Sequence, residues 1–354
     1  MSFIKGIELC RRFHTEVVEP ILSDTNPYLR YSSALIGSGS EVLGYDTEMS
    51  TDHDWGPRVY LFLRKEDIEC SEQIEESLHE RVPEQFYGYP IDLKMSVITT
   101  LPKFIESCLG VNLDESVGLE DWLSFPSQSL LEITSGAIYR DDTGQLSTLR
   151  NQFSYYPHDI WLYLIASSWK RIGQEEHLML RSGFAGDELG SAIIASRIVR
   201  DIINLCFLLE RQYAPYPKWF GTAFKRLKCS DQLLPYLWKA QTATTWRERE
   251  DAFNNVYKRL SSMHNGLGIF EMIPIDVSSF YDRPFKVMNG EGIAKMIMEH
   301  VMDENIRQLG DRRLIGNIDQ ITDNTDFRNI IRESGTEGNH ARKALKKLFF
   351  REGQ

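Results

Sequence analysis

The stretch from Ile36 to Leu63 constrains this chain more than any other segment. It begins with a loop of small residues, Gly37-Ser38-Gly39-Ser40, and ends with an apolar run typical of a strand, Val59 to Leu63. Two acids, Asp52 and Asp54, lie one residue apart before that run. If the strand begins at Asp52, both carboxylates lie on one face and repel each other unless a cation binds between them. Because a glycine-serine loop can present backbone N–H groups to a phosphate, the stretch predicts a site for a nucleoside triphosphate and a metal ion.

Length and charge restrict the class of protein. The chain has 354 residues, of which 42% are hydrophobic and 26% charged, as in ordinary soluble proteins with one large domain or two. The formal net charge of −11 argues against a strong sequence-independent grip on nucleic acid. No uncharged apolar run approaches the length of a membrane span, and the first turns carry several charges. We therefore expect no membrane partner, no signal peptide and a cytoplasmic location.

The cysteines indicate neither a disulfide framework nor a zinc ribbon. They are odd in number and scattered, and no two of them form a C-x-x-C pair. We expect free thiols in a reducing compartment at Cys10, Cys70, Cys108, Cys206 and Cys229.

Hydrophobic periodicity divides the chain into a mixed first part and a helical second part. The elements expected in the first part are a helix from Phe3 to Leu22, strands from Val59 to Leu63 and from Ile91 to Ile98, and a helix from Glu66 to Arg81. Gly56-Pro57 is expected to delay regular pairing before the first of these strands. Long helical patterns dominate from Ile160 onward, first to Arg181 and then from Asp187 to Arg211. The order predicts an α+β fold, with a small mixed-sheet domain over residues 1–150 and a helical-bundle domain over residues 151–354.

The loop and the acid pair also match a known sequence signature. The pair Gly39-Ser40, a second glycine at Gly44 and the D-x-D string Asp52-His53-Asp54 resemble the polymerase-β-like nucleotidyltransferases. The fuller string GSGSEVLGYDTE…STDHDWGPR resembles one subgroup of that superfamily, an uncharacterised domain-of-unknown-function family. Later strings resemble the same subgroup, so that the likeness covers roughly residues 3 to 330: YYPHDIW, RIGQEE, GDELGS, QYAPYPKW and DRPFKV.

The resemblance implies an enzyme that moves a nucleoside monophosphate from a triphosphate to a hydroxyl or amine acceptor. Asp52 and Asp54 would then bind Mg²⁺ or Mn²⁺, and the loop from Ser38 to Ser40 would hold the β- and γ-phosphates, with ATP as the expected nucleotide. Arg58 could contact a phosphate or form a structural salt bridge, and both interpretations stay open. The alternative for the two acids is a loop in which they serve as helix-cap and turn residues.

A third acid on a neighbouring strand usually completes such a site, as a metal ligand and as the base for the acceptor hydroxyl. Asp92 is the candidate, because it is the only acid in the strand expected from Ile91 to Ile98. It lies in the first turn of that strand, whereas the acid of the subgroup precedes the Thr-Thr-Leu that ends it. This chain has Ser96-Val97-Ile98 there. The alternative for Asp92 is an acid paired with Lys94 or with solvent.

The helical part offers residues that could select the acceptor. Glu175 could be the base for a hydroxyl or amine acceptor, as in antibiotic-modifying relatives, although an exposed helical glutamate is the commoner fate. The acceptor could be a small molecule, a protein side chain or an RNA end, and the negative charge weighs against RNA. Two alternatives to this function remain. One is a nucleotide-binding or partner-binding protein on the same fold that has lost catalysis, and the other is an antitoxin-like nucleotidyltransferase that modifies a partner protein.

Overall fold

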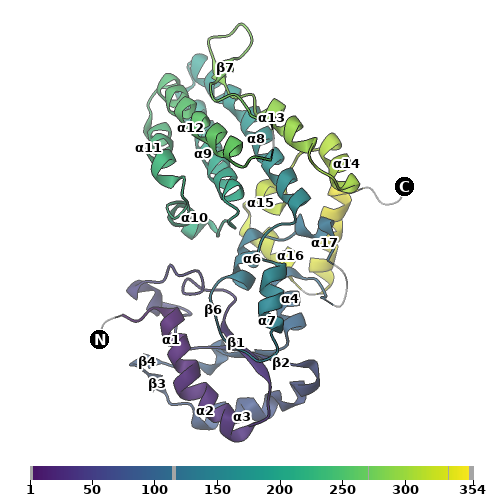
Figure 1. Ribbon diagram of the computed structural model, residues 1–354. Coiled ribbons are helices and arrows are strands. Elements are labelled where there is room, and N and C mark those ends of the chain that lie inside the picture. The colour runs from purple at the N-terminus through teal and green to yellow at the C-terminus, as the bar shows by residue number, and fades with distance from the viewer. Residues whose placement is uncertain (1–2, 114–116, 270, 334, 351–354) are drawn as a thin grey trace. The chain divides into compact units, whose positions relative to one another are not determined.

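The computed structural model describes residues 3–350 apart from 114–116, 270 and 334 (Figure 1). The fold is α+β, as predicted, and includes a four-stranded mixed sheet. The chain forms two compact units that alternate along the sequence. The first unit comprises Met1–Gly118, Phe125–Ser154 and Thr325–Lys343, and the second comprises Leu119–Ser124, Tyr155–Asn324 and Ala344–Gln354.

The sheet of the first unit has the strand order β5-β2-β1-β6. Its strands are β1 (Tyr31–Leu35), β2 (Tyr60–Leu63), β5 (Val97–Thr99) and β6 (Ala137–Asp141). β1 is antiparallel to β2 and β6, and β2 is parallel to β5. Ala34 is paired with Tyr60, which is paired in turn with Val97. The end of β1 therefore lies beside the starts of β2 and β5, and the glycine-serine loop leaves the sheet at this edge.

The other elements of this unit pack around the sheet. The helices are α1 (Gly6–Phe13), η1 (His14–Val18), α2 (Glu19–Thr25), η2 (Glu48–Asp52), η3 (Lys65–Cys70), α3 (Ser71–Arg81), η4 (Leu93–Met95), α4 (Leu101–Leu109), α6 (Ser127–Thr134), α7 (Gln145–Gln152) and α16 (Thr325–Arg332). A two-stranded ribbon joins β3 (Gln85–Phe86) to β4 (Tyr89–Pro90). Helix α17 (Thr336–Phe349) contributes its first residues to this unit and its last to the other.

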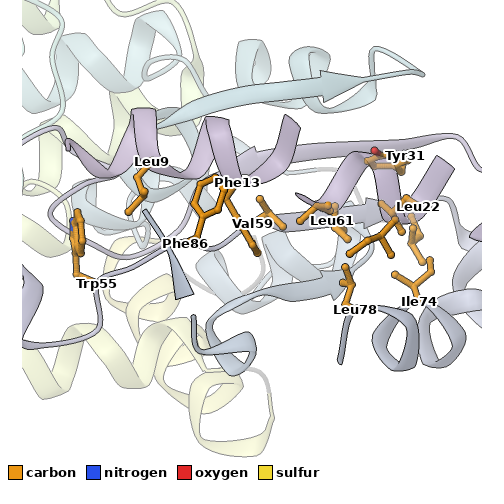
Figure 2. Close-up of a cluster of buried hydrophobic side chains, with 13 residues drawn as sticks. Leu9, Phe13, Leu22, Tyr31, Trp55, Val59, Leu61, Ile74, Leu78 and Phe86 are labelled. Atoms are coloured by element: carbon orange, nitrogen blue, oxygen red, sulfur yellow. The ribbon is translucent and has the colours of Figure 1, made fainter. Parts of the chain in front are cut away.

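A hydrophobic core lies between the first helices and one face of the sheet (Figure 2). The helix expected from Phe3 to Leu22 is confirmed, although it starts at Gly6 and includes the π-helical turn η1. Leu9 and Phe13 are completely buried on its inner face. The Phe13 ring lies 5.7 Å from that of Phe86, in an edge-on arrangement.

β2 is buried on both faces, and this explains its unbroken apolar sequence. Leu61 points into the core of Figure 2. Tyr60 and Phe62 alternate with it and meet the ring of Phe104 in α4, with centroids 5.5 and 5.4 Å apart. A strand covered on both sides is a firm support for the residues at its start.

The two strands expected after the loop differ in how closely they match the prediction. The strand predicted from Val59 to Leu63 is confirmed as β2, which begins at Tyr60, and Pro57 has no N–H with which to extend the ladder. The strand predicted from Ile91 to Ile98 is limited to β5, because Asp92 caps the short helix η4. Side chains of this type bond to the nearby backbone and compete with an extended conformation.

The second unit contains the long helices that the sequence predicted. α8 (His158–Phe184) packs along α9 (Glu188–Leu209), and Trp161 and Trp169 of α8 are buried. The remaining elements are α5 (Leu119–Trp122), α10 (Pro217–Phe224), α11 (Ser230–Thr242), α12 (Trp246–Gly266), β7 (Ser278–Ser279), β8 (Lys286–Val287), α13 (Gly290–Met298), α14 (Glu304–Arg312) and α15 (Ile318–Ile321). None of the helices in the described part of the chain is long and apolar enough to cross a membrane.

The first core gives a test of the fold. Phe13→Ala is expected to lower the free energy of unfolding by about 3–5 kcal/mol, because it removes a fully buried ring. Guanidinium unfolding followed by circular dichroism measures the change. Tyr28→Ala is the matched aromatic control, since that side chain is 94% exposed, and its effect should stay within about 0.5 kcal/mol. Equal losses in the two variants would contradict the assigned core.

Candidate functional site

The glycine-serine loop turns back sharply after β1. Gly37 and Gly39 have φ angles of 90° and 135°, which side chains of L-residues rarely adopt. A Cβ atom on Gly39 would lie 2.4 Å from Oε1 of Glu41 and 2.7 Å from Nη2 of Arg58. The loop therefore requires glycine at this position both for its backbone and because the space beneath is filled. Ser38 is exposed and Ser40 half-buried.

A buried ion pair between Arg58 and Glu41 fills that space. Nη2 of Arg58 lies 2.5 Å from Oε1 of Glu41 and donates a hydrogen bond to the Ser38 carbonyl oxygen at 2.6 Å. The two side chains are only 9% and 1% exposed. Burial raises the pKa of the Glu41 carboxyl above its ordinary value, and the charge of Arg58 opposes this rise. The contacts of Arg58 are those of a structural salt bridge on the buried side of the loop.

Asp46 anchors the far side of the loop to the first helix. One of its carboxylate oxygens accepts hydrogen bonds from the Gly6 N–H at 2.7 Å and from Nε1 of Trp55 at 3.3 Å. The other lies 3.5 Å from Nζ of Lys5. Gly6 is the first residue of α1, where a negative charge is favourable. Sequence reasoning singled out neither Asp46 nor Glu41, although both lie in the string EVLGYDTE.

Asp52 and Asp54 lie on the segment that returns to β2, and both are exposed. Asp52 is the last residue of η2. Asp54 has a φ of 46°, and its Oδ2 lies 3.1 Å from Nε2 of His53. The condition under which both acids would lie on one face of a strand is not met, because the chain turns here and the strand starts only at Tyr60. Their role as metal ligands stays a prediction.

Asp92 does not lie on the strand beside β2. Its Oδ1 accepts a hydrogen bond from the Lys94 N–H at 3.0 Å and so caps η4. The residue directly before β5 is Ser96, whose Oγ accepts a hydrogen bond from the Val59 N–H at 3.2 Å. β5 itself carries no acid, and Ile98 occupies the position directly before Thr99 where the third carboxylate was expected. Within the described ranges, no three His, Cys, Asp or Glu side chains are grouped so that they could hold a metal ion.

In the second unit, the predicted acceptor base Glu175 is engaged in an ion pair. Its Oε1 lies 2.6 Å from Nη2 of Arg197 on α9. Its side chain is mostly buried, so that it is not the exposed helical glutamate named as the alternative to a base. The ion pair joins α8 to α9. Its role as a base remains a prediction.

The next residue of α8, Glu176, has a buried carboxyl that contacts the segment directly before α13. It is 3% exposed and accepts a hydrogen bond from the Met288 N–H at 2.7 Å. Burial raises its pKa to about 7, against the effect of the N–H groups of Met288, Gly290 and Asn289. The carboxyl therefore ties the centre of α8 to the segment that begins α13.

Comparison with known proteins gives a family match and matches to solved structures, all of limited extent. The family described as Domain of unknown function (DUF4037) matches residues 122–220. This segment contains the strings YYPHDIW and QYAPYPKW, and it follows the glycine-serine loop and the acid pair. A crystal structure of a nucleotidyltransferase-like protein from Exiguobacterium sibiricum 255-15 has a TM-score of 0.32 and 11% identity, over 83% of this chain and 91% of that one. No curated protein matches the sequence.

The ion pair beneath the loop predicts a large effect on stability. Arg58→Ala should lower the free energy of unfolding by about 3–5 kcal/mol, because it leaves Glu41 buried without its partner. Chemical denaturation measures this change. Arg11→Ala removes an exposed guanidinium that contacts Glu8, and its effect should be below about 1 kcal/mol. A small effect of Arg58→Ala would show that the pair does not hold the loop.

Glu176 predicts a specific dependence of stability on pH. Its pKa rises from 4.5 to about 7 on folding, so that the folded protein binds this proton more tightly than the unfolded chain. Its contribution is complete below pH 4.5, falls as the pH rises to about 7 and is level above that. The difference in unfolding free energy between wild type and Glu176→Gln should therefore fall by roughly 3 kcal/mol across this range. Glu299→Gln, at an exposed position, should track the wild type at every pH.

Proposed function

We propose that the chain is a metal-dependent nucleotidyltransferase, which moves a nucleoside monophosphate from a triphosphate such as ATP to a hydroxyl or amine acceptor. The observation that carries the proposal is the preformed loop after β1. Its backbone requires glycine at Gly39, a buried ion pair supports it, and two exposed acids follow before the next strand. A loop ordered in advance can bind phosphate without paying for its own ordering.

The chemistry of the exposed donors suits a hard divalent cation. Asp52 and Asp54 supply carboxylate oxygens, which Mg²⁺ and Mn²⁺ prefer, and both side chains are open to solvent. When bound, such a cation would neutralise the charge of the phosphates and polarise the phosphorus that is attacked. We assign the two acids as its ligands in this proposal.

The remaining roles belong to the loop and its supports. Backbone N–H groups and hydroxyls between Ser38 and Ser40 would orient the β- and γ-phosphates, so that pyrophosphate departs in line with the attacking atom. Arg58 and Glu41 would act as positioning residues through the loop, since both are buried beneath it. The acceptor oxygen or nitrogen forms the new bond to the α-phosphorus, the bond to the pyrophosphate oxygen breaks, and the proton of the acceptor passes to solvent water.

One observation favours a second candidate, a protein that binds nucleotide without transferring it. β5 carries no acid, and Asp92 is occupied as a helix cap. A site with two carboxylates could hold a metal–nucleotide complex and still lack the third ligand and base for the acceptor. The candidate partners differ accordingly. An enzyme needs an acceptor, which could be a small molecule or a protein side chain, whereas a binding module needs only the nucleotide or a partner protein in the cytoplasm.

Calorimetry with Mg²⁺-ATP tests the nucleotide site itself. Asp52→Asn and Asp54→Asn should each weaken binding by about ten-fold or more, because each removes a charged ligand of the metal. Glu76→Gln is the control, as it removes one exposed acid from α3 of the same unit and should bind as the wild type does. If none of the four common nucleoside triphosphates binds with either Mg²⁺ or Mn²⁺, the proposal is wrong.

Release of pyrophosphate then separates the enzyme from the binding module. Release that Asp52→Asn abolishes and Glu76→Gln leaves unchanged supports the transferase. Binding without release, across hydroxyl and amine acceptors and a protein acceptor, supports the second candidate. Asp92→Ala should change neither result, because the Asp92 carboxylate is used to cap η4.

A further inference from the structure

The second unit carries an apolar groove at the end of α8. The groove has a volume of about 660 Å³ and lies among the last turns of α8, the first turns of α9 and the loop between β7 and β8. Its apolar wall consists of Leu178, Phe184, Ile194, Pro284 and Phe285. None of these residues is needed for the function proposed above.

Several apolar side chains on this surface are exposed. Leu178 and Phe184 are 40% and 59% exposed, and Ile193, next to the lining residue Ile194, is 56% exposed. The Phe184 ring is nevertheless held in place, with edge-on contacts to the rings of Phe285 at 5.6 Å and Trp246 at 6.1 Å. Fixed aromatic surface beside a hollow is typical of the centre of a binding interface.

Two arginines, Arg181 and Arg283, complete the lining of the groove. Among the residues that the structure describes, no carboxylate lies within ion-pair distance of either guanidinium. Both guanidinium charges act on the same side chain, the imidazole of His177. His177 stacks on Phe280 at 4.8 Å, and both arginines add to the effect of burial in lowering its pKa. The groove thus presents two guanidinium groups on a chain with a net charge of −11. The carboxylate of Asp187 lies beside it and accepts a hydrogen bond from the hydroxyl of the lining residue Ser182 at 3.2 Å.

We propose that this groove binds an acidic amphipathic segment of a partner protein. One large apolar side chain of the segment would pack against Phe184 and Leu178, and carboxylates beside it would pair with Arg181 and Arg283. Guanidinium–carboxylate pairs are strong and directional, which would fix the orientation of the segment. Charge complementarity selects this occupant. A second copy of the chain or an extended nucleic acid would bring further negative charge against the rest of a surface that is already negative.

Synthetic peptides provide the test. The probe is a short labelled helix with leucine and phenylalanine along one stripe and glutamates on both sides of it. A second peptide has lysine in place of each glutamate, and a third has serine in place of each apolar stripe residue. Fluorescence anisotropy with the full chain should show binding of the glutamate peptide about ten-fold or more tighter than binding of the other two.

Charge reversal in the protein gives the decisive comparison. R181E/R283E should lose affinity for the glutamate peptide and gain affinity for the lysine peptide. Leu178→Ser should weaken binding of the glutamate peptide, because it removes apolar contact. K239E/R259E is the matched control, because it changes the net charge equally at exposed positions of the same unit that do not line this groove. It should bind as the wild type does. Circular dichroism confirms that each variant is folded.

The proposal is overturned if wild type binds the glutamate and lysine peptides equally, or if R181E/R283E leaves binding of the glutamate peptide unchanged. It is also overturned if sedimentation shows a dimer that this variant abolishes, which would assign the groove to a second copy. Binding of single-stranded oligothymidine that is lost in the same variant would assign it to nucleic acid. None of these results depends on nucleotidyl transfer, so that the two proposals can fail separately.

Discussion

The conformation of the loop between β1 and β2 depends on one buried ion pair. Glu41 lies within the loop and Arg58 lies just before β2. Their contact therefore joins the two ends of the segment that connects β1 to β2. Because both groups are buried, loss of either charge would leave the other without compensation in the core. The bond from Arg58 to the Ser38 carbonyl and the absence of space for a side chain on Gly39 follow from the same pair.

This arrangement separates the support of the loop from chemistry at its surface. Glu41, Arg58 and Asp46 are buried. Glu41 and Arg58 pair with each other, and Asp46 binds the Gly6 N–H and the side chains of Trp55 and Lys5. Asp52 and Asp54 are exposed and have few protein contacts. In the proposed site, the buried set would supply geometry and the exposed set charge. Preorganised groups of this kind lose little free energy in ordering when a ligand binds.

Within the proposed site, β5 is where transfer and simple binding would differ. β5 carries no acid, and the residue before it, Ser96, accepts a hydrogen bond from the Val59 N–H. The carboxylates of α8 also have assigned structural partners, Arg197 for Glu175 and the Met288 N–H for Glu176. Each of these carboxylates is stabilised within the folded chain by an ion pair or a backbone hydrogen bond. This structural role accounts for both carboxylates without a catalytic one.

The sequence by itself determined the α+β class, the first helix, the two long helices and the apolar strand β2. These features follow from hydrophobic periodicity, which can be seen within a short stretch of the sequence. It also indicated a glycine-dependent loop followed by two acids. Only the tertiary structure decided that Asp92 caps a helix and that Glu41 and Asp46 are buried supports. The two supports depend on partners distant in the sequence, Arg58 and Gly6, so that no local pattern could reveal them.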